Sequence, residues 1–142
     1  MKKGKDMTII IMPLASALGK PELIGISKKH RIQMFDLDSV KNKLQVELAF
    51  LHAEEAFKEK RNISKDRQLE VLIRAAATRQ ISEAVRKIGI RDPKRMLAAC
   101  KTDECKMTEF EIRTMLKAKK IHWKQEDSSE EIRRMIETEV GE

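Results

Sequence analysis

The chain has 142 residues, which is the usual length of one domain with a substantial hydrophobic core. Its formal net charge is +7, Tyr is absent, and aromatic residues make up only 4% of the chain. This composition argues against an all-β sandwich and favours helices packed on a small sheet. No apolar run approaches the ~18 residues of a membrane span, and the run at residues 8–12 is too short for a secretory signal. We therefore expect a cytoplasmic protein in which residues 1–142 form one domain.

The N-terminal part of the chain predicts a strand, a short helix and a second strand. Residues 8–12 are a β-branched apolar run, which is typical of a buried strand. Pro21 suits the first turn of a helix over residues 22–29. The apolar residues within 31–37 predict the second strand. We expect a small, mostly antiparallel or mixed sheet of three or four strands packed against several helices, which is an α+β fold.

A long helix is predicted to follow the second strand and to end at Lys60. Asp38 or Ser39 is its expected N-cap. The helix has more apolar surface than one buried face needs, because it carries two apolar stripes. One stripe holds Val40, Leu44, Leu48 and Leu51, and the other holds Val46, Ala49, Phe50, Ala53 and Phe57. Such a helix is either buried on both sides or lends one side to a partner, and the sequence leaves both interpretations open.

The middle of the chain predicts two helices joined by a polar corner. Apolar residues repeat at helical spacing over residues 69–77 and again over 81–88. The corner Thr78-Arg79-Gln80 lies between them. It is either a contact presented to a phosphate or base, or a solvated turn. Gly89 is expected to end the second helix in the left-handed conformation.

The first of these two helices has a predicted start and a predicted ion pair. Ser64 is the expected N-cap, with Asp66 in the first turn. Glu70 and Arg74 lie four residues apart, which is the right spacing for a pair on one helix face. We therefore expect an ordered helix that begins just after Ser64.

The last third of the chain predicts a strand followed by two helices. Residues 95–101 are short and apolar, which favours a strand, with a helix as the competing interpretation. Thr108 and Ser128 each precede a Glu by three residues, and this capping-box pattern predicts two helix starts. Residues 121–123 are either an edge strand or a loop. We expect Trp123 to pack over a small core rather than to stack on a base.

Catalytic and metal-binding patterns are absent from the sequence. It has no Gly-rich phosphate loop and no kinase motif, and its three histidines have no metal-ligand spacing. Cys100 and Cys105 are its only cysteines, so we expect neither a zinc site nor a disulfide, and Cys100 is interpreted as a core residue. The expectation is a binding module that is not an enzyme and has no metal and no cofactor.

Positive charge is concentrated in the middle of the chain. Residues 58–95 contain twelve Lys or Arg and five Asp or Glu, whereas residues 103–142 contain eight and eleven. A concentrated basic segment suggests an anionic partner such as nucleic acid, and a generally Lys-rich surface is the alternative. If the cations converge in the fold, their guanidinium groups would form a groove that binds phosphates.

Three sequence words in this region resemble a known family. RNIS at residues 61–64, EVLIRAA at 70–76 and TRQISEAVRKIGI at 78–90 are similar to the small kinase-binding subunit of the KEOPS (EKC) complex. That family is related to the protein that binds the p53-related protein kinase. The resemblance covers residues 36–90 well and the N-terminal third loosely. It implies a non-catalytic subunit of the complex that makes threonylcarbamoyl-adenosine beside the anticodon of tRNA.

The resemblance also implies two binding surfaces. Members of the family contact the 3′ end of tRNA, and we carry this role onto Lys60, Arg61, Asn62, Arg74, Arg79 and Gln80. They also dock on the N-terminal lobe of the atypical protein kinase of the complex and support its activity. The candidate docking residues here are Val46, Phe50, Phe57, Ile81 and Val85. One departure is the charged segment 130–142, where the family usually has an apolar segment that returns to the sheet.

Three other functions stay open at this point. Residues 69–88 can be interpreted as the helix-turn-helix of a DNA-binding regulator, although Glu83 would then face phosphates. A small enzyme that uses Glu70 or His52 is the second alternative. A basic structural protein without an RNA-related role is the third.

Overall fold

The structure, a computed structural model, describes residues 8–141. Its centre is a four-stranded sheet in the order β2-β3-β1-β4, with every neighbouring pair antiparallel. The strands are β1 (Ile9–Ser16), β2 (Gln33–Asp36), β3 (Met96–Lys101) and β4 (Ala118–Lys120). The helices are α1 (Lys20–His30), α2 (Lys43–Lys58), α3 (Arg67–Ala76), α4 (Ile81–Ile88), α5 (Thr102–Cys105), α6 (Glu109–Met115) and α7 (Ser129–Val140). The α+β prediction is confirmed.

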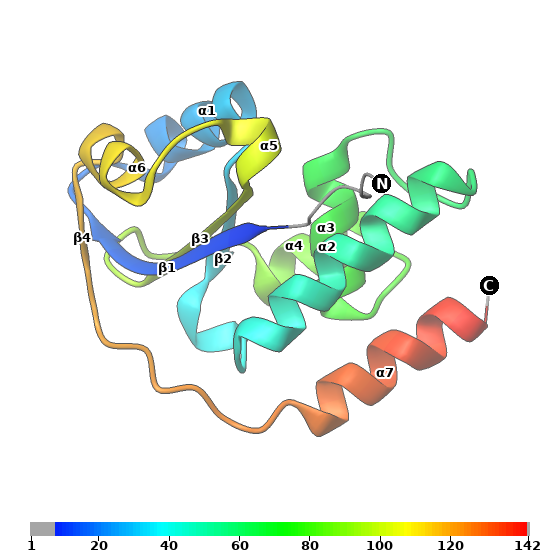
Figure 1. The fold of residues 1–142 in the computed structure, drawn as a ribbon. Coiled ribbons are helices and arrows are strands. Elements are labelled where there is room, and N and C mark those ends of the chain that lie inside the picture. The colour runs from blue at the N-terminus through cyan, green and yellow to red at the C-terminus, as the bar shows by residue number, and fades with distance from the viewer. Residues whose placement is uncertain (1–7, 142) are drawn as a thin grey trace.

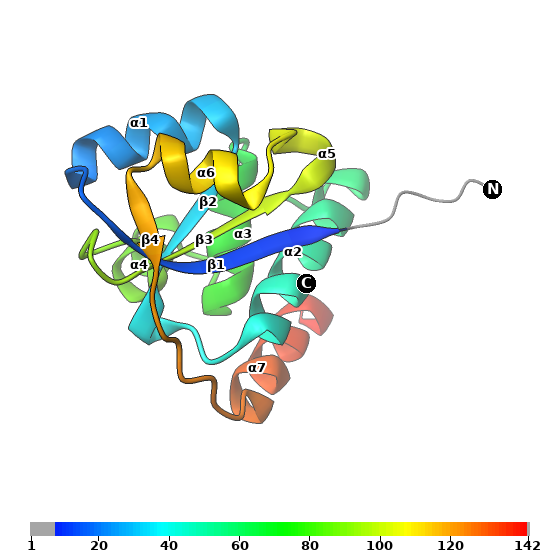
Figure 2. The same cartoon turned by 60° about the vertical axis from the view of Figure 1, so that its left-hand side comes forward.

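Helices cover both faces of the sheet. α1, α5 and α6 lie on one face, and α2, α3 and α4 lie on the other (Figures 1 and 2). Alternate residues of β1 serve the two sides, because successive side chains of a strand point in opposite directions. Met12 and Leu14 pack with α1 and α6, whereas Ile9 and Ile11 pack against the core on the α2 side. The molecule therefore has two hydrophobic cores that share one sheet.

The central strand β3 has a continuous apolar sequence because both of its faces are buried. Leu97 and Ala99 belong to the core on the α2 side, and Met96, Ala98 and Cys100 belong to the other. A strand buried on both faces has no polar side to alternate with, so it lacks the period of two. The strand prediction for this segment is confirmed, and the helical alternative is wrong.

The start of α2 differs from the prediction. Leu37–Ser39 forms a 3₁₀ turn, and the Ser39 hydroxyl donates to Asp36 at 2.6 Å instead of capping a helix. Asn42 is the N-cap of α2, with its side-chain oxygen accepting from the Gln45 backbone N–H. The next helix, α3, is likewise capped by Asp66 rather than by Ser64, because the Asp66 carboxylate accepts from two backbone N–H groups of the first turn.

Gly89 is needed for close approach and not for a left-handed end, so that prediction is wrong. Its φ of −69° and ψ of 159° are extended, and it forms an isolated β-bridge with Phe35. A Cβ at this position would lie 2.7 Å from the Val85 carbonyl oxygen. The helix before it, α3, does end in a left-handed residue, Ala77 with φ 54°.

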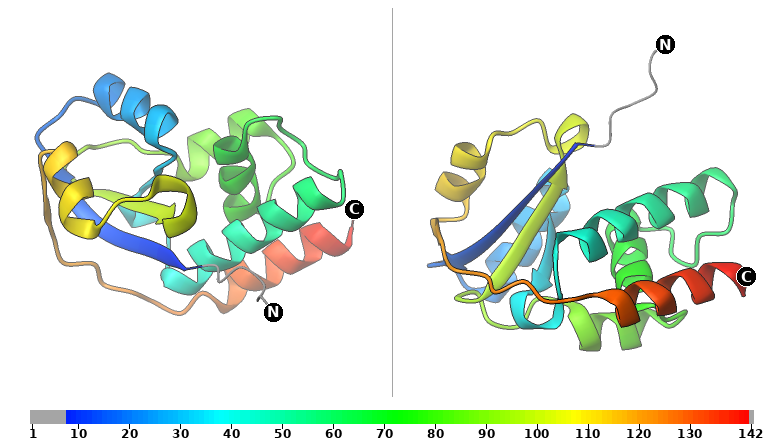
Figure 3. Two further views of the ribbon diagram at one scale, coloured as in Figure 1. Left: turned by 45° about the horizontal axis from the view of Figure 1, so that its top comes forward. Right: turned by 60° about the horizontal axis from the view of Figure 1, so that its bottom comes forward.

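The last third contains an edge strand, a long crossing segment and a helix. β4 precedes residues 121–123, and Trp123 packs against the core as expected. The capping box at Thr108 forms, whereas Ser128 precedes α7 without a side-chain cap. Residues 121–128 carry the chain from β4 to α7, which packs against α2 and α3 (Figure 3). A helix therefore occupies the place of the apolar C-terminal segment that the family resemblance implied.

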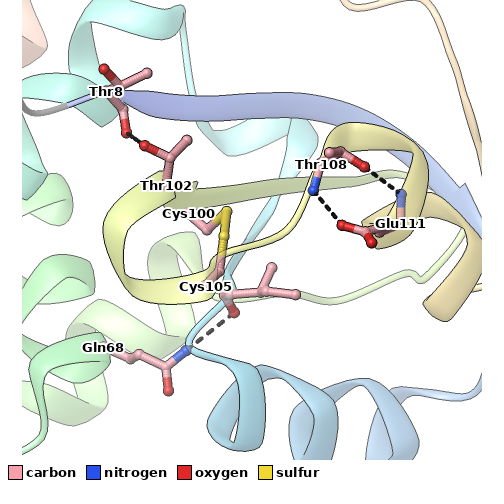
Figure 4. Close-up of a disulfide and its surroundings, with 8 residues drawn as sticks. Thr8, Gln68, Cys100, Thr102, Cys105, Thr108 and Glu111 are labelled. Atoms are coloured by element: carbon pink, nitrogen blue, oxygen red, sulfur yellow. Dashed lines mark hydrogen bonds between the residues drawn. A yellow bond between two sulfur atoms is a disulfide. The ribbon is translucent and has the colours of Figure 1, made fainter.

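The two cysteines are joined as a disulfide, contrary to expectation. Cys100 ends the buried part of β3, and the short helix α5 turns the chain back so that Cys105 meets it (Figure 4). The sequence did not predict this pair, because the two sulfurs meet only when α5 turns the chain back between the two cysteines. Among residues 8–141 no cluster of three metal-ligating side chains exists, and no helix has the length and apolar character to cross a membrane.

Candidate functional site

A buried ion pair organises the corner between α2 and α3. Glu70 is fully buried and Arg74 is 2% exposed. The Arg74 guanidinium donates to Glu70 Oε2 through Nη2 at 2.6 Å and through Nε at 2.9 Å. Glu70 Oε1 accepts from the backbone N–H groups of Ile63 at 2.9 Å and Ser64 at 2.7 Å. The spacing predicted the pair, and the structure shows that the pair holds the loop before α3 in place.

The C-terminal helix supplies a second carboxylate to this network. Arg74 Nη1 donates to Glu139 Oε2 at 2.7 Å, and Arg61 Nη1 donates to Glu139 Oε1 at 3.1 Å. Two of the arginines that the sequence marked for phosphate therefore converge, but they converge on an acidic side chain of α7. Arg74 has almost no exposed surface, so in this fold it stabilises the corner between α2 and α3 and has no surface to offer to RNA. Glu139 was not predicted from the sequence, because it lies far along the chain in a segment of mixed charge.

The other predicted RNA contacts lie in two separate places. Lys60 is exposed just after α2, and Asn62 is half-buried with its amide donating to the Ser64 carbonyl oxygen at 3.0 Å. Arg79 and Gln80 are exposed in the turn between α3 and α4. These four residues stay predictions for RNA contact, since they offer polar groups at the surface but do not share one loop.

A cavity of about 440 Å³ lies between α2, the start of α3 and the end of β3, and we call it the α2–α3 cavity. The sequence had not predicted it, because its walls come from segments far apart in the chain. Phe57 forms part of one wall, with the Arg67 guanidinium 4.4 Å from the centre of its ring. The complete lining is Lys28, Arg31, Gln33, Phe50, Ala53, Glu54, Phe57, Asp66, Arg67, Gln68, Val71, Lys101 and Glu104.

Four cations and three carboxylates line the α2–α3 cavity, and this small excess of positive charge suits a planar ligand that carries negative charge. Gln33 is 4% exposed, and its Oε1 has no hydrogen-bond partner among residues 8–141. An unpaired buried amide oxygen is costly, so it marks a place where a hydrogen-bond donor of a ligand would be stabilised. Arg31 and Arg67 add guanidinium groups near the aromatic wall. Lys101 is less available, because it already pairs with Glu54 at 2.7 Å.

The predicted docking residues divide into buried and exposed sets. Val46 and Phe50 are buried in the core of the domain, so they offer no surface to a partner in this fold. Phe57 is half-buried in the wall of the α2–α3 cavity. Ile81 and Val85, at 39% and 45% exposed, are accessible on α4. On α2 the exposed apolar residues belong to the other stripe and are Leu44 and Leu51.

His52 on α2 lies beside the same carboxylate of α7. Its Nδ1 is 3.5 Å from Glu139 Oε2. Burial lowers the pKa of His52, and the negative charges of Glu139 and Glu55 raise it by less. The nearby Arg74 and Arg61 lower the pKa further, so the net shift is downward and the imidazole is neutral in the folded protein at pH 7.

Acidification is expected to destabilise the protein through His52. The pKa in the folded state lies below its ordinary value of 6.5, so the unfolded chain binds more protons at mildly acidic pH. The stability contributed by neutral His52 is therefore present above pH 6.5 and is lost as the pH falls through the folded-state pKa. Urea unfolding at pH 7.5 and 5.5 should show a larger loss for the wild type than for His52→Gln. Equal losses in the two proteins would contradict this.

Comparison with known proteins agrees with the resemblance at the level of the family. The family model described as kinase binding protein CGI-121 matches residues 16–139, from the end of β1 into the last turn of α7. No curated protein matches the chain. The helix-turn-helix alternative receives no support from these comparisons. Because the matched segment covers most of the chain, including the α2–α3 corner and α7, the chain belongs to the CGI-121 family of kinase-binding proteins.

Proposed function

We propose that this protein is the non-catalytic, kinase-binding subunit of a KEOPS-type complex and that it also binds the 3′ end of tRNA. In that role it supports the atypical kinase subunit in the cytoplasm and performs no chemistry itself. The family match supports the kinase partner. The observation that carries the RNA part is the α2–α3 cavity, in which the Gln33 amide oxygen has no hydrogen-bond partner among residues 8–141.

The α2–α3 cavity has the groups that an unstacked base and its phosphate require. Phe57 offers an aromatic face that the Arg67 guanidinium covers in this structure, 4.4 Å from the ring centre. A base that takes the place of Arg67 can stack there, and such stacking tolerates any base. The Gln33 amide can hydrogen-bond to the edge of the base, which is open only in single-stranded RNA. Arg31 and Arg67 can fork onto phosphate oxygens. A tRNA 3′ end is single-stranded, so it presents all of these partners together.

The kinase-docking surface that we propose is the exposed apolar side of α4. Ile81 and Val85 lie one turn apart on this helix and are both accessible. Burial of such side chains against another protein removes apolar surface from water, which favours association. The RNA-binding cavity and this surface involve different helices, so a single substitution can disable one and spare the other.

Phe57→Ala is expected to weaken binding of a tRNA with an intact 3′ end by about tenfold, because one stacking contact is lost. Fluorescence anisotropy measures this affinity. Leu51→Ala, an exposed apolar truncation on α2, is the control for RNA binding.

Val85→Asp is expected to abolish co-purification with the tagged kinase subunit and to leave tRNA affinity unchanged. Co-purification measures the retained kinase. Val140→Asp on α7 is the control for kinase binding.

The shortened tRNA provides the deciding comparison. Wild-type protein should bind a transcript that lacks its 3′-terminal nucleotides as weakly as Phe57→Ala binds the intact one. The RNA part of the proposal fails if intact and shortened transcripts bind the wild type equally. The kinase part fails if Val85→Asp and Val140→Asp both retain the kinase at the wild-type level.

A further inference from the structure

A second cavity, of about 580 Å³, lies at the other end of the sheet, and we call it the α6–β4 cavity. Phe110 and Arg113 of α6 contribute to it together with Lys119 of β4. Lys94, just before β3, completes a wall near the end of β1. α6 and β4 lie together at the edge of the sheet, away from α2 (Figures 1 and 2).

The charges of the α6–β4 cavity are all positive. Lys94, Arg113, Lys117 and Lys119 line it, and no carboxylate does. None of these four cations makes an ion pair with any residue in the described range 8–141. Lys120 of the same strand is different, because it pairs with Glu109 at 3.4 Å. Uncompensated like charges gathered in a concave site raise the local concentration of a polyanion.

Protection of a sheet edge does not explain the positions of all four cations. Lysines on an edge strand such as β4 prevent pairing with another chain, and this accounts for Lys119. It does not account for Lys94 and Arg113, which come from a loop and from α6. Moreover, the Arg113 Nε is buried and has no hydrogen-bond partner among the described residues. Arg113 therefore has hydrogen-bonding capacity that the described residues do not use.

Phe110 adds an aromatic face to the same cavity. It is 69% exposed, although Phe is a residue type that folding normally buries. Phe110 and Arg113 lie three residues apart on α6, so they share one helix face. Proteins that bind single-stranded nucleic acid combine cations, which contact the phosphates, with an aromatic side chain on which a base stacks.

We propose that the α6–β4 cavity is a second nucleic-acid site, which binds a single-stranded segment. Phosphate oxygens accept from Lys94, Arg113 and Lys119, and one base stacks on Phe110. The site is separate from the α2–α3 cavity, because Lys94 lies just before β3 and Lys101 ends it, and the six residues of β3 span about 17 Å. The proposal goes beyond binding of a tRNA 3′ end and does not depend on it.

The test measures binding of a fluorescent twelve-nucleotide oligouridine whose 3′ end is blocked, in a Phe57→Ala background that weakens binding at the α2–α3 cavity. Phe110→Ala should weaken binding about fivefold or more through lost stacking. Lys94→Gln/Lys119→Gln should reduce the slope of log affinity against log salt concentration by about 1.4, since each phosphate contact in a single strand contributes ~0.7. The matched control is Lys43→Gln/Lys87→Gln, which removes two exposed cations from α2 and α4.

Each alternative outcome overturns the proposal in a different way. If the control pair lowers the salt slope as much as the cavity pair, binding is due to diffuse charge. If the lysine variants weaken binding and Phe110→Ala does not, the cavity binds a simple anion instead of a single strand. Displacement of the oligonucleotide by an equal concentration of poly-glutamate would assign the cavity to an acidic protein. Circular dichroism and thermal unfolding of each variant establish that it is folded.

Discussion

Replacing Arg74 with Met is expected to lower the free energy of unfolding by about 3–5 kcal/mol, measured by urea denaturation at pH 7.5. The Arg74 guanidinium faces Glu70 on its own helix and Glu139 on α7, and almost none of it is exposed. Met fills much of the same volume without the charge, so Glu70 becomes a buried carboxylate with no cationic partner. The expected loss therefore arises from an uncompensated charge and not from a cavity.

An exposed arginine pair provides the matched control for Arg74. Arg86 donates to Glu83 at 2.8 Å on the surface of α4, and Arg86→Met is expected to cost less than about 1 kcal/mol. The double variant Glu70→Gln/Arg74→Met should recover part of the loss, because Gln keeps an acceptor for the Ile63 and Ser64 N–H groups without a charge. Equal losses for Arg74→Met and Arg86→Met would contradict the structural role of the buried pair.

Phe35→Ala is expected to destabilise the protein by about 3–5 kcal/mol, measured by urea and thermal unfolding. Phe35 on β2 is fully buried in the core on the α2 side. It also forms the bridge to Gly89, at which the end of α4 meets the sheet. Truncation at this site removes a large apolar side chain and leaves a space that two rigid elements cannot close.

Phe110→Ala is the same truncation at an exposed site and serves as the control. Phe110 is mostly in contact with water, so its loss should change stability by no more than about 0.5 kcal/mol. A similar loss for the two variants would contradict the burial assigned to Phe35. A near-neutral Phe110→Ala also means that any loss of nucleic-acid binding in this variant comes from the surface and not from misfolding.

Local patterns predicted most of the elements because each pattern depends on neighbouring residues. The β-branched run in β1, the helical spacing in α3 and α4 and the capping box at Thr108 all appear in the structure. The errors occurred where a distant segment changed the local outcome. Gly89 ends α4 in an extended conformation since it bridges to Phe35 on another strand. Ser39 does not cap α2, because its hydroxyl is bound by Asp36.

The candidate sites were less predictable than the fold. The two surfaces that the family resemblance suggested depend on exposure, and exposure is a property of packing. Arg74 and Phe50 carry the charge and the apolar surface that binding requires, yet both are buried. Conversely, the sequence analysis did not predict Gln33 or Phe110 as site residues. Only in the folded chain does the Gln33 amide oxygen lie at a cavity without a partner among residues 8–141, and only there does Phe110 lie beside four cations.

The sequence by itself determined an α+β domain, its membership of a kinase-binding family and the Glu70–Arg74 pair, because these follow from periodicity, motif words and fixed spacing. The tertiary structure decided which charges are available. It brought Glu139 of α7 across to Arg61 and Arg74, and it neutralised a cluster that the sequence marked as basic. It also gathered Lys94, Arg113 and Lys119 at one cavity, where none of them pairs with a carboxylate among residues 8–141. The electrostatic role of a residue depends on charges within a few ångströms in space, and chain order does not record that distance.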